Sequence, residues 1–174
     1  EMRPGDWSSD VCSSDLETLY AFHLAKKAMR EKKACILCEG NMDVIAYHSA
    51  GITNAVAPMG TALTVEQLRL ISSFVDTLIL SLDTDEAGQK AVKAALALFS
   101  KTGVKVKVIM LSGGKDPDEI LKNQGGQDKF KTLIDESLNA VEYYLHITKA
   151  KYNINTADGK KNYLNDASRI LARV

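Results

Sequence analysis

Acidic side chains follow three of the apolar segments of this 174-residue chain, at or shortly after the point where each segment ends. A ligand set made only of carboxylates is the one that Mg²⁺ prefers, and Mg²⁺ held by a few carboxylates commonly also binds substrate phosphates. The pattern therefore indicates phosphoryl or nucleotidyl transfer, and a cluster of this size can hold two metal ions. The six residues are Glu39, Asp43, Asp83, Asp85, Asp116 and Asp118.

Each carboxylate also has a purely structural interpretation. Asp116 precedes Pro117, which is typical of a helix start, and Asp118 would then complement the helix dipole. Asp85 could start a helix at 86–100 in the same way, and Asp43 could be a solvated residue in the first turn of a helix at 42–50. Together, however, the like charges would raise one another's pKa values and destabilise the fold unless a cation compensates. This favours a metal site for the group as a whole.

An alternation of apolar runs and amphipathic segments must position these carboxylates. Buried strands are predicted at 34–38, 54–57, 78–82 and 104–110. Helices are predicted at 17–33, 42–50, 65–76 and 86–100. Thr64 and Gln67 form a capping-box pattern at the start of the third helix. Strands joined through helices predict an α/β fold, with a mainly parallel four-stranded sheet covered by helices on both faces. Ligands of such sheets bind beyond the carboxyl ends of the strands.

The chain divides into three parts. Residues 1–16 contain a repeated Ser-Ser-Asp and follow neither the helix nor the strand period, so we interpret them as a non-native or disordered leader. Residues 17–125 are expected to form the sheet domain with its lead-in helix. Residues 126–174 have helical patterning only and are expected to form a helical subdomain. That pattern stops without an end signal, so we expect the chain to be a piece of a longer protein.

Composition limits the classes of function. Hydrophobic residues make up 45% of the chain and charged residues 25%, which is typical of a globular protein. Lys and Arg total 22 and so do Asp and Glu, so no overall positive field favours nucleic acid. The local candidate for a nucleic-acid contact is the basic group Lys26, Lys27 and Arg30, with a solvated helix end as the alternative.

The apolar runs and the cysteines indicate the cellular compartment of the protein. The apolar runs are strand-sized, which argues against a membrane span. The three cysteines are an odd number, and no secretory signal is apparent, so a cytoplasmic location is expected. Cys35 and Cys38 lie within a predicted strand and are interpreted as core residues, with a redox or metal role as the lesser alternative.

Four segments resemble the motifs of one known family. Residues 39–44, Glu-Gly-Asn-Met-Asp-Val, are similar to the Glu-Gly-Tyr-Met-Asp-Val segment of bacterial DnaG-type primases. Residues 57–64, 83–91 and 115–119 resemble later blocks of the same family in the same order. The resemblance covers about nine-tenths of the chain, from residue 19 onward. Asn41 stands where an aromatic residue is usual, and Thr84 replaces the glycine between the two aspartates.

This resemblance implies a Toprim fold and a DNA-directed RNA polymerase, a nucleotidyltransferase that makes short RNA primers for DNA replication. It implies that Glu39, Asp83 and Asp85 are the catalytic candidates, with Glu39 as acid or base. The implied metal is Mg²⁺ or Mn²⁺, and its implied ligands are Glu39, Asp83, Asp85 and Asp116, supported by Asp43 and Asp118.

The same resemblance implies the partners. They are a single-stranded DNA template, ribonucleoside triphosphates and, through a carboxy-terminal domain outside this chain, the replicative helicase of the primosome. Zinc is expected only in an amino-terminal domain outside this chain. The implied location is the bacterial cytoplasm, at the nucleoid. The basic half of the catalytic core also lies outside the chain, so we expect the isolated chain to make no primers.

Two alternatives stay open. One is another Toprim enzyme, a topoisomerase or a nuclease. A topoisomerase needs a nucleophilic tyrosine, and Tyr143, Tyr144, Tyr152 and Tyr163 all lie in plain helical context. The other alternative is a Toprim scaffold that binds metal without catalysis.

Overall fold

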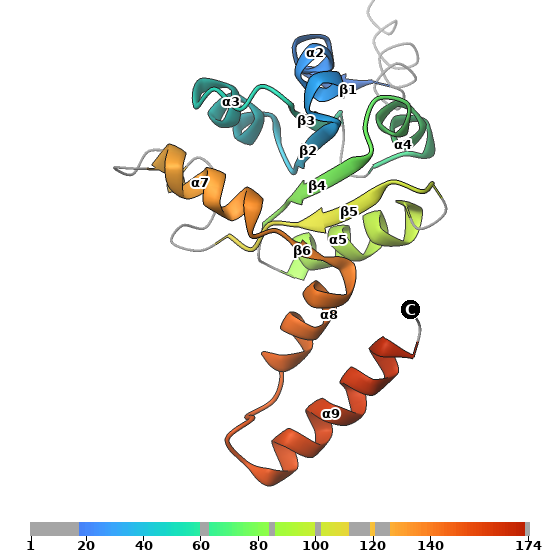
Figure 1. The fold of residues 1–174 in the computed structure, drawn as a ribbon, viewed down its shortest axis with the longest axis vertical. Helices are drawn as coiled ribbons and strands as arrows, with labels where there is room; N and C mark the ends of the chain where they lie inside the picture. The colour runs from blue at the N-terminus through green and yellow to red at the C-terminus, as the bar shows by residue number, and fades with distance from the viewer. Residues whose placement is uncertain are drawn as a thin grey trace, which may run out of the picture. The chain divides into compact units, whose positions relative to one another are not determined.

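The computed structural model contains a mainly parallel sheet (Figure 1). The structure describes residues 18–59, 63–83, 86–99, 102–111, 119–120 and 126–172. Within these ranges the chain forms six strands and seven helices, and none of these helices is long and apolar enough to cross a membrane. The chain divides into two compact units, Glu1–Ser137 and Leu138–Val174.

Four parallel strands form the core of the sheet in the order β3-β2-β4-β5. They are β3 (Ala55–Pro58), β2 (Ala34–Cys38), β4 (Thr77–Ser81) and β5 (Lys105–Val108). Ala34 lies opposite Thr77 and Cys38 opposite Ser81, so β2 and β4 end level with each other. The predicted α/β fold with a mainly parallel sheet is confirmed, but within the described residues the sheet has six strands rather than the expected four.

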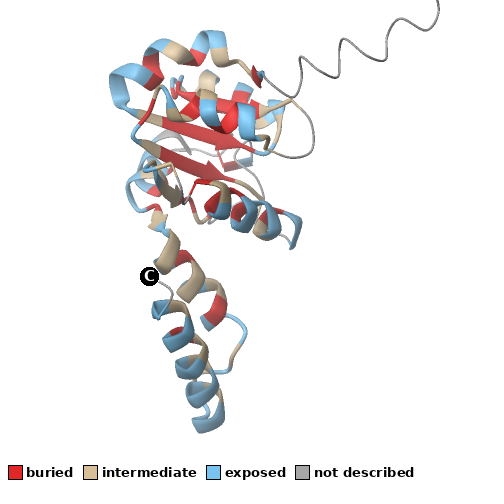
Figure 2. Ribbon diagram, turned by 90° about the vertical axis from the view of Figure 1, so that its right-hand side faces the viewer, coloured by how far each residue is buried: buried red, intermediate tan, exposed pale blue. Residues whose placement is uncertain are grey.

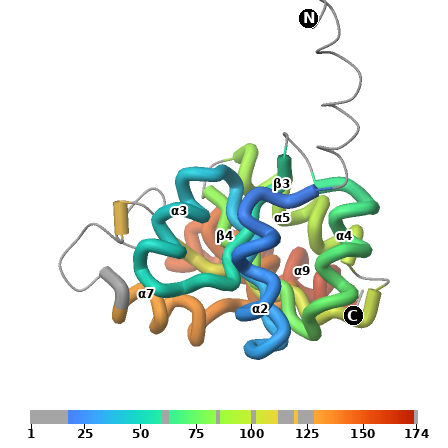
Figure 3. Tube along the Cα trace, turned by 90° about the horizontal axis from the view of Figure 1, so that it is seen from above, coloured from blue at the N-terminus to red at the C-terminus, as the bar shows by residue number. Residues whose placement is uncertain are grey.

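The helices cover both faces of this sheet, as expected (Figures 1 and 3). On one face lie α3 (Asn41–Ser49) and α7 (Gly126–Asp135), and on the other lie α2 (Phe22–Lys32), α4 (Val65–Ser72) and α5 (Glu86–Phe99). The connection from β2 runs outward to β3, whereas the connection from β4 runs the opposite way to β5. The direction therefore reverses between β2 and β4, which is where α/β sheets bind their ligands.

The predicted capping box at the start of α4 is confirmed. The Gln67 amide N–H donates to Thr64 Oγ1 at 3.2 Å, and the Thr64 N–H donates to Gln67 Oε1 at 3.1 Å. The buried Gln67 side chain also donates through Nε2 to the Thr18 carbonyl at 2.8 Å. The helix ends at Ser72, earlier than expected, and at this end the Ser72 and Ser73 hydroxyls donate to main-chain carbonyls of the preceding turn.

The prediction of a continuous helix over 17–33 is wrong at its start. Leu19–Tyr20 forms the short strand β1, in which Leu19 pairs with Pro58 and Tyr20 with Ala57 in antiparallel register. Ala21 follows with φ 60°, in the left-handed region, and the helix begins only at Phe22. Pairing with a free sheet edge has overridden the helical spacing of the apolar residues.

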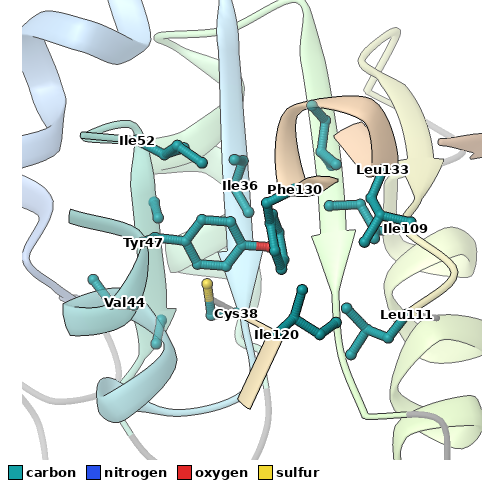
Figure 4. Close-up of a cluster of buried hydrophobic side chains, with 13 residues drawn as sticks. Ile36, Cys38, Val44, Tyr47, Ile52, Ile109, Leu111, Ile120, Phe130 and Leu133 are labelled. Atoms are coloured by element: carbon teal, nitrogen blue, oxygen red, sulfur yellow. The ribbon is translucent and has the colours of Figure 1, made fainter. Parts of the chain in front are cut away.

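A buried apolar cluster joins α3, the sheet and α7 (Figure 4). The rings of Tyr47 and Phe130 meet edge to face, with centroids 4.7 Å apart and planes at 87°. Tyr47 Oη donates to Ser81 Oγ at 2.7 Å, and both residues are buried. Phe130 is part of this cluster, so α7 packs within the first unit, Glu1–Ser137.

The central strands are the most buried elements of the first unit (Figure 2). Cys35 and Cys38 of β2 are both fully buried, and burial raises the pKa of both thiols. Residues three apart on a strand lie on opposite faces, so the two thiols do not form a pair. This agrees with the interpretation of both cysteines as core residues.

The second unit is a short helical hairpin. It consists of β6 (Leu138–Asn139), α8 (Ala140–Lys149) and α9 (Ala157–Leu171). Asn139 Oδ1 accepts the N–H groups of Val141 and Glu142, both at 3.0 Å, and so caps α8. Tyr152 Oη donates to Asp166 Oδ2 at 2.5 Å, which ties the connection between the helices to α9. The helical patterning predicted after residue 126 is confirmed, with β6 as the addition.

Candidate metal centre

Two of the predicted carboxylate residues meet at the point where the sheet reverses direction. Glu39 directly follows β2, and Asp83 follows β4 after Leu82. The main-chain N–H of Asp83 donates to Glu39 Oε2 at 3.1 Å. Glu39 is exposed and Asp83 is half-buried. The hydrogen bond therefore turns the Glu39 carboxylate toward the end of β4.

Asp43 lies in the first turn of α3, close behind Glu39 in sequence. Its Oδ2 accepts the N–H of Gly40 at 3.1 Å, so it stabilises the start of the helix. Its charge also contributes, after burial, to raising the pKa of Cys38 and of Tyr47. The structural interpretation of Asp43 is thus supported, and its role toward a metal stays a prediction.

The first turn of α5 lies directly against the main chain of Asp83. A Cβ atom added to Gly88, the third residue of this helix, would lie 2.0 Å from the Asp83 carbonyl oxygen and 2.8 Å from the carbonyl carbon. Only glycine allows the helix to come this close. Gly88 was not among the residues predicted for the site. Two signals could have found it: Gly88 lies within residues 83–91, which resemble a block of the primase family, and it is a glycine near the start of an alanine-rich helix, where alanine would be the better helix former.

A cavity of about 420 Å³ lies beside Glu39. Its walls are mostly apolar and come from Leu37, Pro58, Leu63 and Leu82, together with alanines of α5. Lys90 and Glu39 are the charged residues of the lining. This hollow was not predicted, because it depends on how far α5 stands from the ends of three strands.

The other predicted ligands, Asp85, Asp116 and Asp118, lie outside the described residues. Within the described ranges, no group of three or more His, Cys, Asp or Glu side chains could hold a metal ion. Glu39 and Asp83 nevertheless offer the hard oxygen donors that suit Mg²⁺ or Mn²⁺. Glu39 is also oriented by a hydrogen bond, as metal-binding carboxylates commonly are. The residues present fit such an ion as part of its ligand set.

The basic residues of α2 lie at the other end of the strands. Lys26 Nζ lies 5.3 Å and Arg30 Cζ 4.7 Å from the centre of the Phe74 ring, and Phe74 precedes the start of β4. Lys27 Nζ lies 3.9 Å from Glu31 Oε1, and both side chains are exposed. Packing on Phe74 supports the structural interpretation for Lys26 and Arg30. Nucleic-acid contact by the three residues stays a prediction.

Known proteins are similar to this chain in sequence and in fold. The model of a family described as Toprim-like matches residues 36–121. A DNA primase of Treponema pallidum is 39% identical over 142 residues, and one of Campylobacter jejuni is 42% identical over 146 residues. The chain contains a Toprim-like region, and these two sequence relatives are bacterial DNA primases. The aligned segments cover 82% and 83% of this chain but only 23% and 24% of those two primases.

Solved structures of primases have the same fold. The RNA polymerase domain of a Mycobacterium tuberculosis primase matches with a TM-score of 0.79 and 27% identity, over 91% of this chain and 51% of that one. An Aquifex aeolicus primase, comprising zinc-binding and RNA polymerase domains, matches with a TM-score of 0.70 and 34% identity, over 91% and 40%. The chain thus spans about a quarter of the length of its curated primase relatives and about half of a primase RNA polymerase domain.

Proposed function

We propose that this chain is the metal-binding part of a primase catalytic core, which transfers nucleotides to make short RNA primers on single-stranded DNA. The observation that carries the proposal is the 3.1 Å hydrogen bond from the Asp83 N–H to the Glu39 carboxylate, at the reversal point of the sheet. It brings together two carboxylate residues that are 44 positions apart, in a chain that is 39% identical to a DNA primase over 142 residues.

The carboxylates have separate roles in this proposal. Mg²⁺ or Mn²⁺ is held by Glu39, Asp83, Asp85 and Asp116, with Asp43 and Asp118 in support. Such an ion stabilises negative charge on the reacting phosphate oxygens when it is bound. Glu39, exposed at the end of β2, is the candidate to take the proton of the attacking hydroxyl. The Asp83 N–H keeps the Glu39 carboxylate turned toward the end of β4.

The partners follow from the relatives. The Mycobacterium tuberculosis RNA polymerase domain was solved in complex with double-stranded DNA, in one case with a 6-nucleotide overhang. We infer that a DNA template and ribonucleoside triphosphates approach the acidic edge of this chain. Lys26, Lys27 and Arg30 would add to the DNA contact away from that edge. The replicative helicase would bind through parts of the whole primase beyond this chain, within the bacterial primosome.

A primer-synthesis assay tests this function. The matching region of the Aquifex aeolicus primase, which is 40% identical to this chain over 121 residues, would be replaced by that of this chain. Incorporation of labelled ribonucleotides on single-stranded DNA would then be measured. We expect the chimera to make primers, its Glu39→Gln variant to make none, and a Glu66→Gln control on the exposed start of α4 to be active. We expect no primers from the 174-residue chain alone.

Two outcomes would contradict the proposal. Unchanged synthesis by the Glu39→Gln chimera would remove Glu39 from the mechanism. Cleavage or relaxation of DNA by the chimera, without primer synthesis, would favour a nuclease or a topoisomerase.

A further inference from the structure

Gly88 lies outside the acidic group but packs against the main chain of Asp83. The role inferred for it rests on the proposed function. We infer that Gly88 is a positioning residue: it lets α5 pack directly against the Asp83 main chain and so sets the Asp83 N–H on the Glu39 carboxylate. Gly88 packs against the Asp83 main chain, and the Asp83 N–H donates to the Glu39 carboxylate. The contacts therefore run from α5, through the segment after β4, to the end of β2.

The space at Gly88 is too small for any side chain. A Cβ at this position would lie 2.0 Å from the Asp83 oxygen, 2.8 Å from its carbonyl carbon and 3.2 Å from its nitrogen. Real Cβ atoms essentially never come within 3.0 Å of another atom, so helix and loop must separate by about 1 Å. All three atoms belong to the main chain, so no flexible side chain can absorb the clash.

A separation of that size reaches the metal site. The Asp83 N–H donates to Glu39 Oε2 at 3.1 Å, near the upper limit for a hydrogen bond of this kind. A displacement of about 1 Å would break it and move the Asp83 carboxylate relative to that of Glu39. Loss of the groups that orient metal ligands typically weakens metal binding by roughly 10- to 100-fold.

Helix propensity alone predicts that Gly88→Ala stabilises the fold, whereas the clash with the Asp83 main chain predicts that it destabilises the fold. Alanine is a better helix former than glycine, so the substitution would raise the melting temperature if nothing else changed. The glycines of this chain also offer a matched control at the other end of α5. Gly103 has φ +74°, and nothing lies within 4 Å of an added Cβ. Gly103→Ala therefore strains the backbone without touching Asp83.

Mn²⁺ titration followed by electron paramagnetic resonance tests the inference on the 174-residue chain. We expect Gly88→Ala to bind Mn²⁺ roughly 10- to 100-fold more weakly than the wild type and to melt at a lower temperature. We expect Gly103→Ala also to melt lower but to bind Mn²⁺ as the wild type does. Wild-type affinity in Gly88→Ala would overturn the inference. Equal weakening in Gly103→Ala would overturn it too, because lost stability alone would then explain the effect.

Hydrogen exchange of the wild type provides a test that needs no variant. If α5 and Asp83 move together, saturating Mg²⁺ slows exchange in the first turn of α5 and leaves its last turn, near Phe99, unchanged. No change in the first turn of a chain that does bind the metal would overturn the inference even if Gly88→Ala failed to fold. If the wild type binds no Mn²⁺, the metal site of the proposed function fails first, and the inference falls with it.

Discussion

Replacing Tyr47 with phenylalanine removes one hydroxyl group from the core beneath the carboxylates. Tyr47 is 0% exposed and Ser81 is 1% exposed, and their oxygens lie 2.7 Å apart. Phenylalanine keeps the ring, so its packing on Phe130 is preserved and no large cavity forms. The Ser81 hydroxyl then loses this partner in a buried site. A buried polar group left without its partner costs about 1–3 kcal/mol, which we expect as the loss in unfolding free energy.

Urea denaturation followed by circular dichroism measures this loss. The set comprises the wild type, Tyr47→Phe, Ser81→Ala and the double variant, with Tyr163→Phe in α9 as the control for loss of a tyrosine hydroxyl. We expect the double variant to lose less than the sum of the single losses, with a coupling energy of about 0.5–3 kcal/mol. Additive losses, or a Tyr47→Phe change no larger than the control, would refute the buried hydrogen bond.

Three further results are expected. Phe130→Ala should cost about 3–5 kcal/mol in urea denaturation, because it empties a fully buried site that joins α7 to α3, whereas Leu164→Ala, at a residue 63% exposed, should cost far less. Burial raises the pKa of the Cys35 and Cys38 thiols above their ordinary 9.0, so the unfolded chain loses these protons first. The unfolding free energy should hold below pH 9 and fall as the pH rises above it, and a flat profile to pH 10.5 would count against buried thiols. Asp83→Asn should leave the metal-free melting temperature unchanged or slightly higher, and unfolding of this variant would mean that Asp83 has a structural role instead.

Much of the fold follows from local patterns. The run at 34–38 is apolar throughout, and it forms β2 at the predicted boundaries because a central parallel strand is buried on both faces. Thr64 and Gln67 cap α4 as expected, since a capping box needs only residues three apart. In each case the decisive interactions lie within one segment.

The features that were wrong or missed depend on distant parts of the chain. Leu19 has helical spacing, and only its pairing with Pro58 makes it part of a strand. The sequence pattern alone groups Phe130 with the helical region after residue 126. Only the contact of its ring with Tyr47 shows that Phe130 packs in the first unit.

The candidate site likewise has features that the sequence pattern predicts and features that depend on contacts between distant parts of the chain. The general rule for strand ends predicts that Glu39 and Asp83 lie at one edge of the sheet, and in the structure a hydrogen bond joins the two residues. That rule contains no distances, so it could not predict that the main chain of Asp83 donates the hydrogen bond. For the same reason it could not predict that α5 approaches closely enough to require Gly88.

Calorimetric titration of Mg²⁺ into the 174-residue chain tests most directly that the edge carrying Glu39 and Asp83 binds a divalent metal. We expect saturable binding by the wild type and by the Glu66→Gln control. At free Mg²⁺ of about 100 times Kd, this binding should stabilise the fold by roughly 2.7 kcal/mol. Glu39→Gln and Asp83→Asn should each bind at least about 10-fold more weakly, because each replaces an anionic oxygen ligand with an amide. Wild-type affinity in both variants, or no binding by the wild type, would contradict the metal site.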